Sequence, residues 1–123
     1  MGEQSKFIAH INKNGDEQSV LEHCKNAVDF ASEMLRSVKL SAVGQLSGYF
    51  HDAGKCTEEF CDYIRKSADG EKVTRGSIIH SFSGLSYFLK KYHKSDSVGV
   101  KELAAEIIAY AIGSHHGLFD MYD

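Results

Sequence analysis

Apolar residues recur along the chain at helical spacing and predict five helices. We expect these helices over about residues 19–38, 41–54, 57–68, 78–93 and 101–116. Their inward-facing positions, one group for each helix, are Val20, Cys24, Ala27, Val28, Ala31 and Leu35; Val43, Leu46 and Phe50; Phe60, Ile64 and Ala68; Ile78, Phe82, Leu85, Phe88, Leu89 and Tyr92; and Leu103, Ile107, Ile108, Ala111 and Ile112. The sequence contains no proline and few alternating β-branched runs, so it predicts a compact all-α fold that needs no strands.

Polar residues at the predicted helix ends support these boundaries. Ser19 and Glu22 have the spacing of a capping box at the start of the first helix. Thr57 can cap the third helix, and the two glutamates that follow it favour the positive end of the helix dipole. Gly117 suits a left-handed C-cap after the last helix.

Length and composition indicate a single domain over residues 1–123. A chain of this size can bury one core, and its hydrophobic content of 42% is ordinary for a globular protein. No apolar run approaches the ~18–20 residues of a membrane span, and the N-terminus lacks the pattern of a signal peptide. Cys24, Cys56 and Cys61 form no CxxC pair, which favours free thiols and a cytoplasmic location.

Histidine is the residue type that changes this ordinary picture. Of seven histidines, His10 and His93 lie in polar surroundings and are expected at the surface. The other five lie in or at the end of apolar helical stretches: His23, His51, His80, His115 and His116. A lone histidine on such a stretch is usually a core or rim residue with one hydrogen-bond partner. Five of them together with Asp52, spread over four predicted helices, instead suggest one shared site.

The spacing of these residues is compatible with metal binding. His115 continues the buried stripe of the last helix, and His116 projects from the next position around the helix. His51 and Asp52 form a similar pair at the end of the second helix. Imidazoles with a carboxylate suit iron, manganese, cobalt, nickel or zinc more than calcium, and Asp52 has two oxygens with which to bridge ions ~3.5–4 Å apart. Two-metal sites of this kind hydrolyse phosphate esters.

Lys55 follows this pair closely and has two interpretations. It can lie near the site and neutralise a phosphate, or it can be a solvated lysine that complements the negative end of a helix dipole. The sequence leaves both interpretations open.

The motifs "LEHCKNA", "GYFHDAGKCTEEFCDYI", "IIHSFSG" and "AIGSHHGLF" occur in this order. They resemble the HD nuclease of type I CRISPR systems, within the HD superfamily of metal-dependent phosphohydrolases. The resemblance covers about residues 19–119 and implies an all-helical nuclease that cleaves single-stranded DNA in antiviral defence. Its implied partners are a superfamily 2 helicase, fused or separate, and a guide-RNA surveillance complex that displaces the target strand.

Carried onto this sequence, the resemblance implies two ions that share Asp52. His23, His51 and Asp52 would hold one ion, and Asp52, His80, His115 and His116 would hold the other. The resemblance also allows magnesium, besides the transition metals, as the bound ion. It implies that Asp52 and Lys55 are catalytic residues.

The family pattern continues into further helices, which bring a last aspartate to the first ion. This sequence ends at "GLFDMYD", where Asp120 and Asp123 follow the histidine pair too closely to match that ligand. We therefore expect an incomplete first ion site. We also expect an uncovered apolar surface, which favours self-association or a partner.

Two other functions remain open at this point. One is an HD phosphohydrolase that acts on nucleotides or cyclic dinucleotides, and the other is an inactive metal-loaded module that binds a partner. The net charge of −3 argues against strong binding of a phosphate backbone through the surface alone. The basic clusters at 71–75 and 89–94 are short enough to be solvated surface, and a helicase partner that delivers the strand would explain the weak basic track.

Overall fold

The computed structural model describes residues 7–74, 77–94 and 99–116. Five α-helices dominate it: α1 (Val20–Met34), α2 (Ser41–Phe50), α3 (Glu58–Ala68), α4 (His80–Tyr92) and α5 (Val100–Gly113). A short 3₁₀ helix, η1 (Ala53–Lys55), follows α2, and the strands β1 (Ile8–Ile11) and β2 (Glu17–Ser19) form a hairpin before α1. The predicted all-α class and its five helices are confirmed.

The predicted caps of α1 and α3 are present. The Ser19 hydroxyl accepts a hydrogen bond from the backbone N–H of Glu22 at 3.1 Å. The Thr57 hydroxyl accepts one from the backbone N–H of Phe60 at 3.2 Å. Both bonds satisfy backbone donors that a helix start leaves without partners. Gly117, Asp120 and Asp123 lie outside the described residues.

The expectation that no strands are needed was wrong. β1 and β2 pair antiparallel across a turn in which the Asn12 side chain accepts hydrogen bonds from the backbone N–H groups of Asn14 and Asp16, both at 2.9 Å. Gly15 completes the turn with a φ of 88°, a conformation that glycine adopts without strain. These strands are too short to show a clear alternating pattern in the sequence.

Several helices end earlier than predicted. The first helix stops at Met34 rather than 38, the second at Phe50 rather than 54, and the last at Gly113 rather than 116. The residues after α2 and α5 are those that carry the predicted ligands. His51 keeps helical backbone angles (φ −55°, ψ −40°), whereas Asp52 departs from them (φ −109°, ψ 17°), and His115 and His116 lie in the turn after α5.

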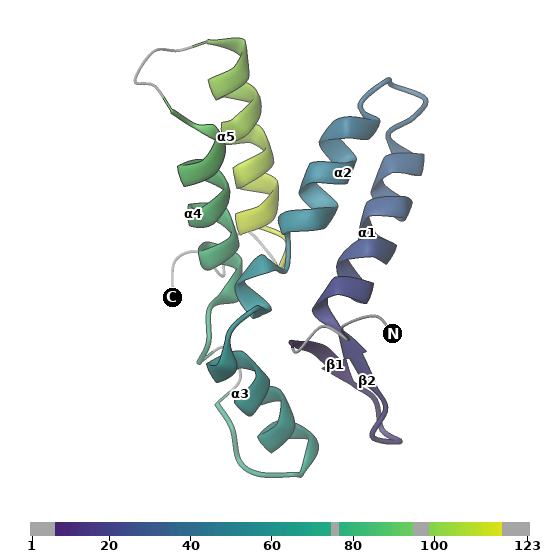
Figure 1. Cartoon of the computed structure of the whole chain (residues 1–123), viewed down its shortest axis with the longest axis vertical. Helices are drawn as coiled ribbons and strands as arrows, with labels where there is room; N and C mark the ends of the chain where they lie inside the picture. The colour runs from purple at the N-terminus through teal and green to yellow at the C-terminus, as the bar shows by residue number, and fades with distance from the viewer. Residues whose placement is uncertain (1–6, 75–76, 95–98, 117–123) are drawn as a thin grey trace, which may run out of the picture.

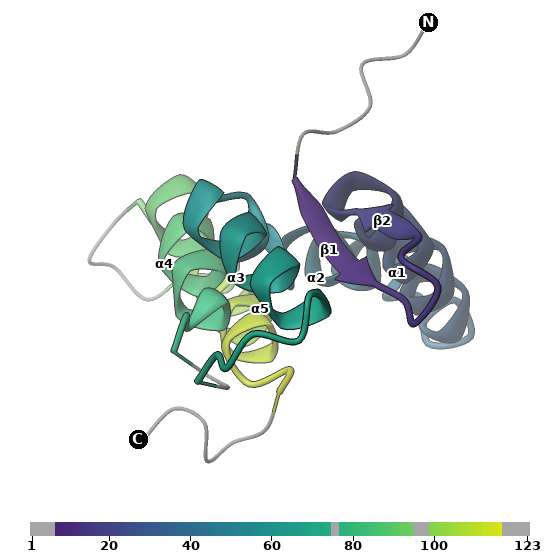
Figure 2. The ribbon, with the colours of Figure 1, turned by 90° about the horizontal axis from the view of Figure 1, so that it is seen from below.

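The helices form two antiparallel pairs, α1 with α2 and α4 with α5 (Figure 1). The hairpin and α3 lie together below them, and the view from below shows β1 between α1 and α3 (Figure 2). α1 and α2 approach closely at Gly48, where a Cβ would lie 2.7 Å from the backbone nitrogen of Val28. η1, which follows α2, contacts α4 and so links the two helix pairs.

The main core lies between α4, α5 and α2. Its buried residues are Phe88, Ala105, Ile108, Ala109 and Ile112, with Val43, Leu46, Phe50, Leu85 and Leu89 packed against them. A smaller cluster joins the hairpin to α1 through Ala9, Val20 and Cys24.

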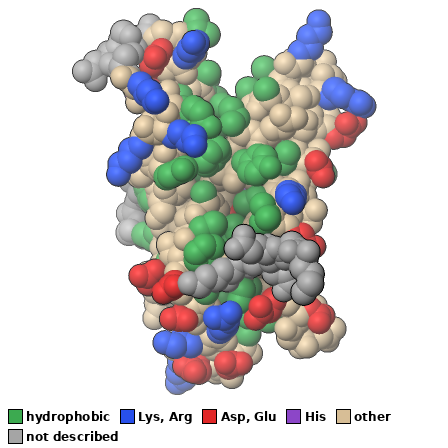
Figure 3. Space-filling model, in the orientation of Figure 1, with side chains coloured by type: hydrophobic (Ala, Val, Ile, Leu, Met, Phe, Trp, Pro, Cys, Tyr) green, Lys and Arg blue, Asp and Glu red, His purple; other side chains and the backbone are tan. Residues whose placement is uncertain are grey.

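A substantial apolar surface remains exposed. Leu103 and Ile107 were predicted to face inward, but they are 52% and 58% exposed because α5 buries its opposite side. Hydrophobic side chains gather over α5, α4 and α2 on one face of the molecule (Figure 3). In the part of the chain that the structure describes, no helix is long and apolar enough to cross a membrane.

Candidate metal centre

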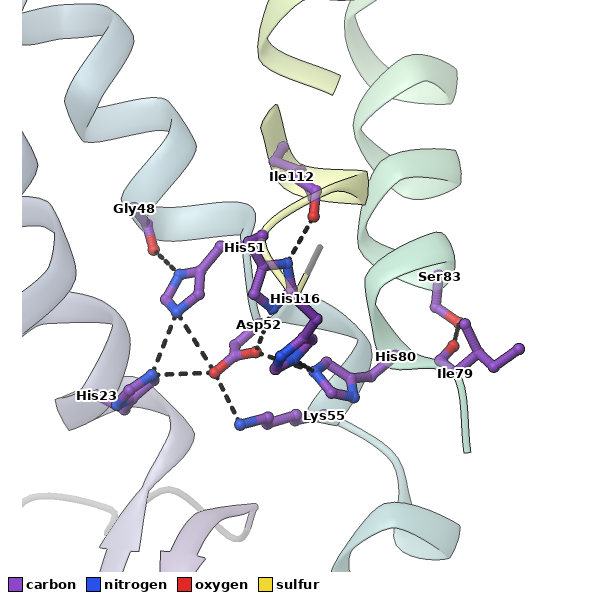
Figure 4. Close-up of polar contacts among 11 residues, drawn as sticks. His23, Gly48, His51, Asp52, Lys55, Ile79, His80, Ser83, Ile112 and His116 are labelled. Carbon is purple, nitrogen blue, oxygen red and sulfur yellow. Dashed lines mark hydrogen bonds and ion pairs between the residues drawn. The ribbon is translucent and has the colours of Figure 1, made fainter. Parts of the chain in front are cut away.

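The structure brings all six predicted ligand residues and Lys55 to one place (Figure 4). His23 comes from α1, and His51 and Asp52 come from the turn after α2. His80 is the first residue of α4, and His115 and His116 follow the end of α5. Helix ends from both helix pairs thus meet around one carboxylate.

Asp52 is the centre of the cluster and is only 2% exposed. Its two oxygens face different sets of side chains. Oδ2 lies near Lys55 Nζ at 2.9 Å, His23 Nε2 at 3.0 Å and His51 Nε2 at 3.4 Å. Oδ1 lies 3.3 Å from the Nε2 atoms of both His80 and His115. The carboxylate therefore divides the histidines into two groups, one for each oxygen.

His116 joins the Oδ1 group from the solvent side. Its Nε2 lies 2.6 Å from Nε2 of His80, and its side chain is exposed. One ligand atom each from Asp52, His80, His115 and His116 lies within 4.8 Å of the other three. This group could hold a metal ion.

Backbone carbonyls orient two of the imidazoles. Nδ1 of His51 donates to the carbonyl of Gly48 at 2.7 Å, and Nδ1 of His115 donates to the carbonyl of Ile112 at 2.6 Å. A carbonyl can only accept, so each Nδ1 carries a proton and the neutral ring keeps its lone pair on Nε2. In both rings this lone pair faces Asp52. Second partners of this kind are typical of histidines that ligate metals.

The buried polar atoms at the centre also fit a cation. Among the described residues, Asp52 Oδ1 and His115 Nε2 are buried without a hydrogen-bond partner, although they lie only 3.3 Å apart. Two acceptors at this distance repel each other unless a proton or a metal ion lies between them. The donor set of imidazole nitrogens and a carboxylate suits a divalent transition metal.

The protonation states of Asp52 and His116 at neutral pH also favour the binding of a cation. Burial alone would raise the pKa of Asp52, but close contacts with His115, His51 and His80, together with Lys55, hold it well below its usual range. Burial and the neighbouring His115 and His80 lower the pKa of His116 to about 4. The centre therefore presents an ionised carboxylate and, at His116, a neutral imidazole.

The pKa values of His23 and His51, the two histidines of the Oδ2 group, shift in opposite directions. Burial is the main cause that lowers the pKa of His23. Burial also acts to lower the pKa of His51, but the Asp52 carboxylate and the Gly48 carbonyl together raise it. The lowered pKa of His23 favours the neutral imidazole that a cation binds, whereas the raised pKa of His51 favours its protonated form.

Gly54 explains why the motif requires a glycine after the His-Asp pair. A Cβ at this position would lie 1.9 Å from the carbonyl oxygen of His80, so only glycine lets η1 approach the start of α4. This approach places His80 beside Asp52.

Lys55 is not the solvated lysine of one sequence interpretation. It is 4% exposed, pairs with Asp52 and lies 5.4 Å from the centre of the Phe60 ring. Its charge neutralises Asp52 rather than facing solvent.

Sequence reasoning missed His10. It is exposed as predicted, but its ring centroid lies 4.7 Å from that of His23, and one ligand atom each from His10, His23 and Asp52 lies within 4.8 Å of the other two. No motif around His10 signals this, because the contact depends on how the hairpin packs. His93, the other predicted surface histidine, pairs with Glu106 at 3.0 Å.

Comparison with known proteins adds no relative to this picture. No protein-family model, curated protein or solved structure matches the chain.

Proposed function

We propose that this chain is a metal-dependent phosphohydrolase of the HD type, and that it acts as a nuclease on single-stranded DNA in CRISPR interference. The observation that carries the proposal is the convergence of four separate histidine motifs on the two oxygens of one buried carboxylate. A single structural histidine needs one partner, whereas these side chains direct several nitrogens at the same two oxygen atoms.

The groups present would hold one or two divalent ions, from manganese, iron, cobalt, nickel, zinc or magnesium. When bound, such ions activate water and stabilise negative charge on a phosphate ester. Asp52 would bridge the two positions through its separate oxygens. His80, His115 and His116 would bind at Oδ1, and His23 and His51 at Oδ2.

The rest of the chain would orient this centre and admit a substrate. Gly48 and Ile112 hold the rings of His51 and His115 through their carbonyls. His116 is exposed, so the Oδ1 group is open to solvent on that side. Lys55 is buried against Asp52, and we assign it to neutralising the carboxylate rather than to contact with a substrate phosphate.

One observation favours the second candidate, hydrolysis of a nucleotide or cyclic dinucleotide. A groove of about 820 Å³ opens beside His10, between the β1–β2 turn and α3. Its volume lies within the range of small-molecule sites. Its lining includes Lys13 and Arg65 but also Glu17 and Asp69, so it lacks the excess of positive charge expected along a bound single strand.

The two candidates differ in the substrate they hydrolyse. Metal-free protein would be supplied with manganese, nickel or magnesium and given a single-stranded DNA circle, a linear strand, a mononucleotide and a cyclic dinucleotide. We expect metal-dependent cleavage of the circle by the wild type and by His93→Ala, and none by Asp52→Ala. Turnover of the small nucleotides without cleavage of either strand would replace the nuclease with the second candidate.

A further inference from the structure

His10 owes its position to an irregularity in β1. Ile8 pairs with Ser19 and His10 with Gln18, so the register shifts between them and Ala9 has no partner in the opposite strand. Ile8 and Ala9 are both buried, whereas successive residues of a regular strand point to opposite faces. Such a bulge re-aims the following side chain, and bulges often occur beside functional sites. Here the side chain that follows is His10.

The strand that carries His10 is firmly attached. Ala9 is fully buried against Val20 and Cys24 of α1, and the backbone N–H of Ile8 donates to Cys61 Sγ of α3 at 3.4 Å. The backbone N–H of Val20 also donates to the carbonyl of Phe7 at 2.9 Å. An imidazole on such a support keeps its position better than one on a loop.

His10 lies beside His23, which contacts the oxygen of Asp52 whose ligand group is smaller. Its ring meets that of His23 edge-on, with an interplanar angle of 72°. His23 Nε2 in turn lies 3.0 Å from Oδ2 and 3.2 Å from His51 Nε2. His10, His23 and His51 are thus neighbours on the Oδ2 side, as His80, His115 and His116 are on the Oδ1 side.

We propose that His10 is a metal ligand, which supplies a third imidazole to a cation bound at Oδ2 of Asp52. This inference rests on the proposed metal centre, but not on which phosphate ester that centre hydrolyses. The resulting set of three imidazoles and one carboxylate oxygen favours zinc, cobalt or nickel over magnesium. Ligand atoms around a four-coordinate ion with bonds of ~2.0–2.1 Å lie roughly 3.4 Å apart. The His10, His23 and Asp52 atoms therefore need to close in by no more than about 1.4 Å from their limit of 4.8 Å.

Lys55 makes the two cation positions unequal. Its ammonium lies 2.9 Å from Oδ2, the oxygen that the His10 group shares, while Oδ1 has no hydrogen-bond partner among the described residues. A cation at Oδ2 must share that oxygen with a positive charge already there, which opposes its binding. We therefore expect the Oδ1 group to fill first and the His10 group second.

The test is a titration of the metal-free full chain with cobalt, followed by equilibrium dialysis and by the visible spectrum of the bound ion. Wild type should bind two ions in two steps. His10→Ala should bind the first ion with unchanged affinity and the second at least about tenfold more weakly. His93→Ala, a substitution of the other surface histidine, should match wild type. His80→Ala should have the reverse effect, because it should lose binding of the first ion, at Oδ1.

Thermal unfolding in chelator establishes that each variant is folded, and His10→Gln repeats the test with a polar side chain. Two ions bound by His10→Ala with wild-type affinities would overturn the assignment of His10. A wild type that binds one ion, unaffected by His10→Ala, would overturn it as well. Two bound ions, of which only the second depends on His10, in a protein that cleaves no DNA would uphold the ligand and refute only the nuclease.

Discussion

Replacing Lys55 with methionine should destabilise the metal-free protein and make its stability strongly dependent on metal. Lys55 and Asp52 are 4% and 2% exposed, and their charged atoms lie 2.9 Å apart. Methionine keeps much of the lysine stem and its packing near Phe60, but it leaves the buried carboxylate without its nearest positive charge.

Removing one partner of a buried ion pair costs about 3–5 kcal/mol, because the remaining charge is left uncompensated. For a chain of this length, 1 kcal/mol changes Tm by roughly 4 °C. Lys55→Met should therefore lower the Tm of the chelated protein by about 12–20 °C. Methionine in place of Lys25, which is exposed on α1, should change the free energy of unfolding by less than about 0.5 kcal/mol.

Metal should restore much of the lost stability. A cation that binds only the folded state adds about 2.7 kcal/mol at one hundred times its Kd. In wild type a cation bound at Oδ2 would share that oxygen with Lys55, whereas in Lys55→Met it would not. The metal-induced rise in Tm, measured by circular dichroism with chelator and with zinc, should therefore be larger in Lys55→Met. Equal rises in the two proteins, or no loss of stability in chelator, would refute the role assigned to Lys55.

Three further predictions follow from the same contacts. Gly54→Ala places a Cβ 1.9 Å from the His80 carbonyl oxygen, so it should lower Tm in chelator and weaken metal binding in dialysis; unchanged values would contradict the close approach. Asp52→Ala should abolish binding of both ions because it removes the shared carboxylate, and retention of one ion would argue against bridging. The pKa of His116 is about 4 in the folded chain, below its ordinary value of 6.5, so the unfolded chain binds more protons between these values. The contribution of His116 to stability in chelator should therefore fall as the pH is lowered from 6.5 towards 4, opposite in sign to that of His51, so the stability difference between wild type and His116→Ala should change over this range; a pH-independent difference would count against the shift.

The helices were predictable from the sequence because their signals are local. Ser19 and Thr57 cap α1 and α3 through hydrogen bonds that span three residues, and the apolar spacing between such caps is visible in the sequence. The outward face of α5 was not predictable in this way. That helix is apolar around most of its circumference, so the pattern alone does not say that Ile108 is buried and Ile107 exposed.

The grouping of the ligands was also predictable, in part, from spacing and resemblance. His51 and Asp52 adjoin in the sequence, and so do His115 and His116, so each pair had to reach a common region. Which oxygen of Asp52 each imidazole faces depends on how α1, α2, α4 and α5 pack, and no local signal encodes this. The position of His10 depends on a bulge in a hairpin that the sequence pattern did not reveal.

The burial of Lys55 was not predictable from the sequence either, although Lys55 lies close to Asp52 along the chain. It lies only three positions after Asp52, yet the sequence left its burial open. The 3₁₀ turn after α2 decides the matter, since it brings Lys55 Nζ to Oδ2, and Gly54 permits that turn by fitting against the His80 backbone.

The most direct measurement is anomalous diffraction from crystals of the full chain soaked in manganese or zinc. Data collected on both sides of the metal absorption edge would locate each ion independently of any activity. The account predicts one ion between Asp52 Oδ1 and the side chains of His80, His115 and His116. It predicts a second ion, at higher metal concentration, between Asp52 Oδ2 and the side chains of His10, His23 and His51. Ions found only away from Asp52, or none at the carboxylate at any concentration, would contradict the metal centre on which the proposed function rests.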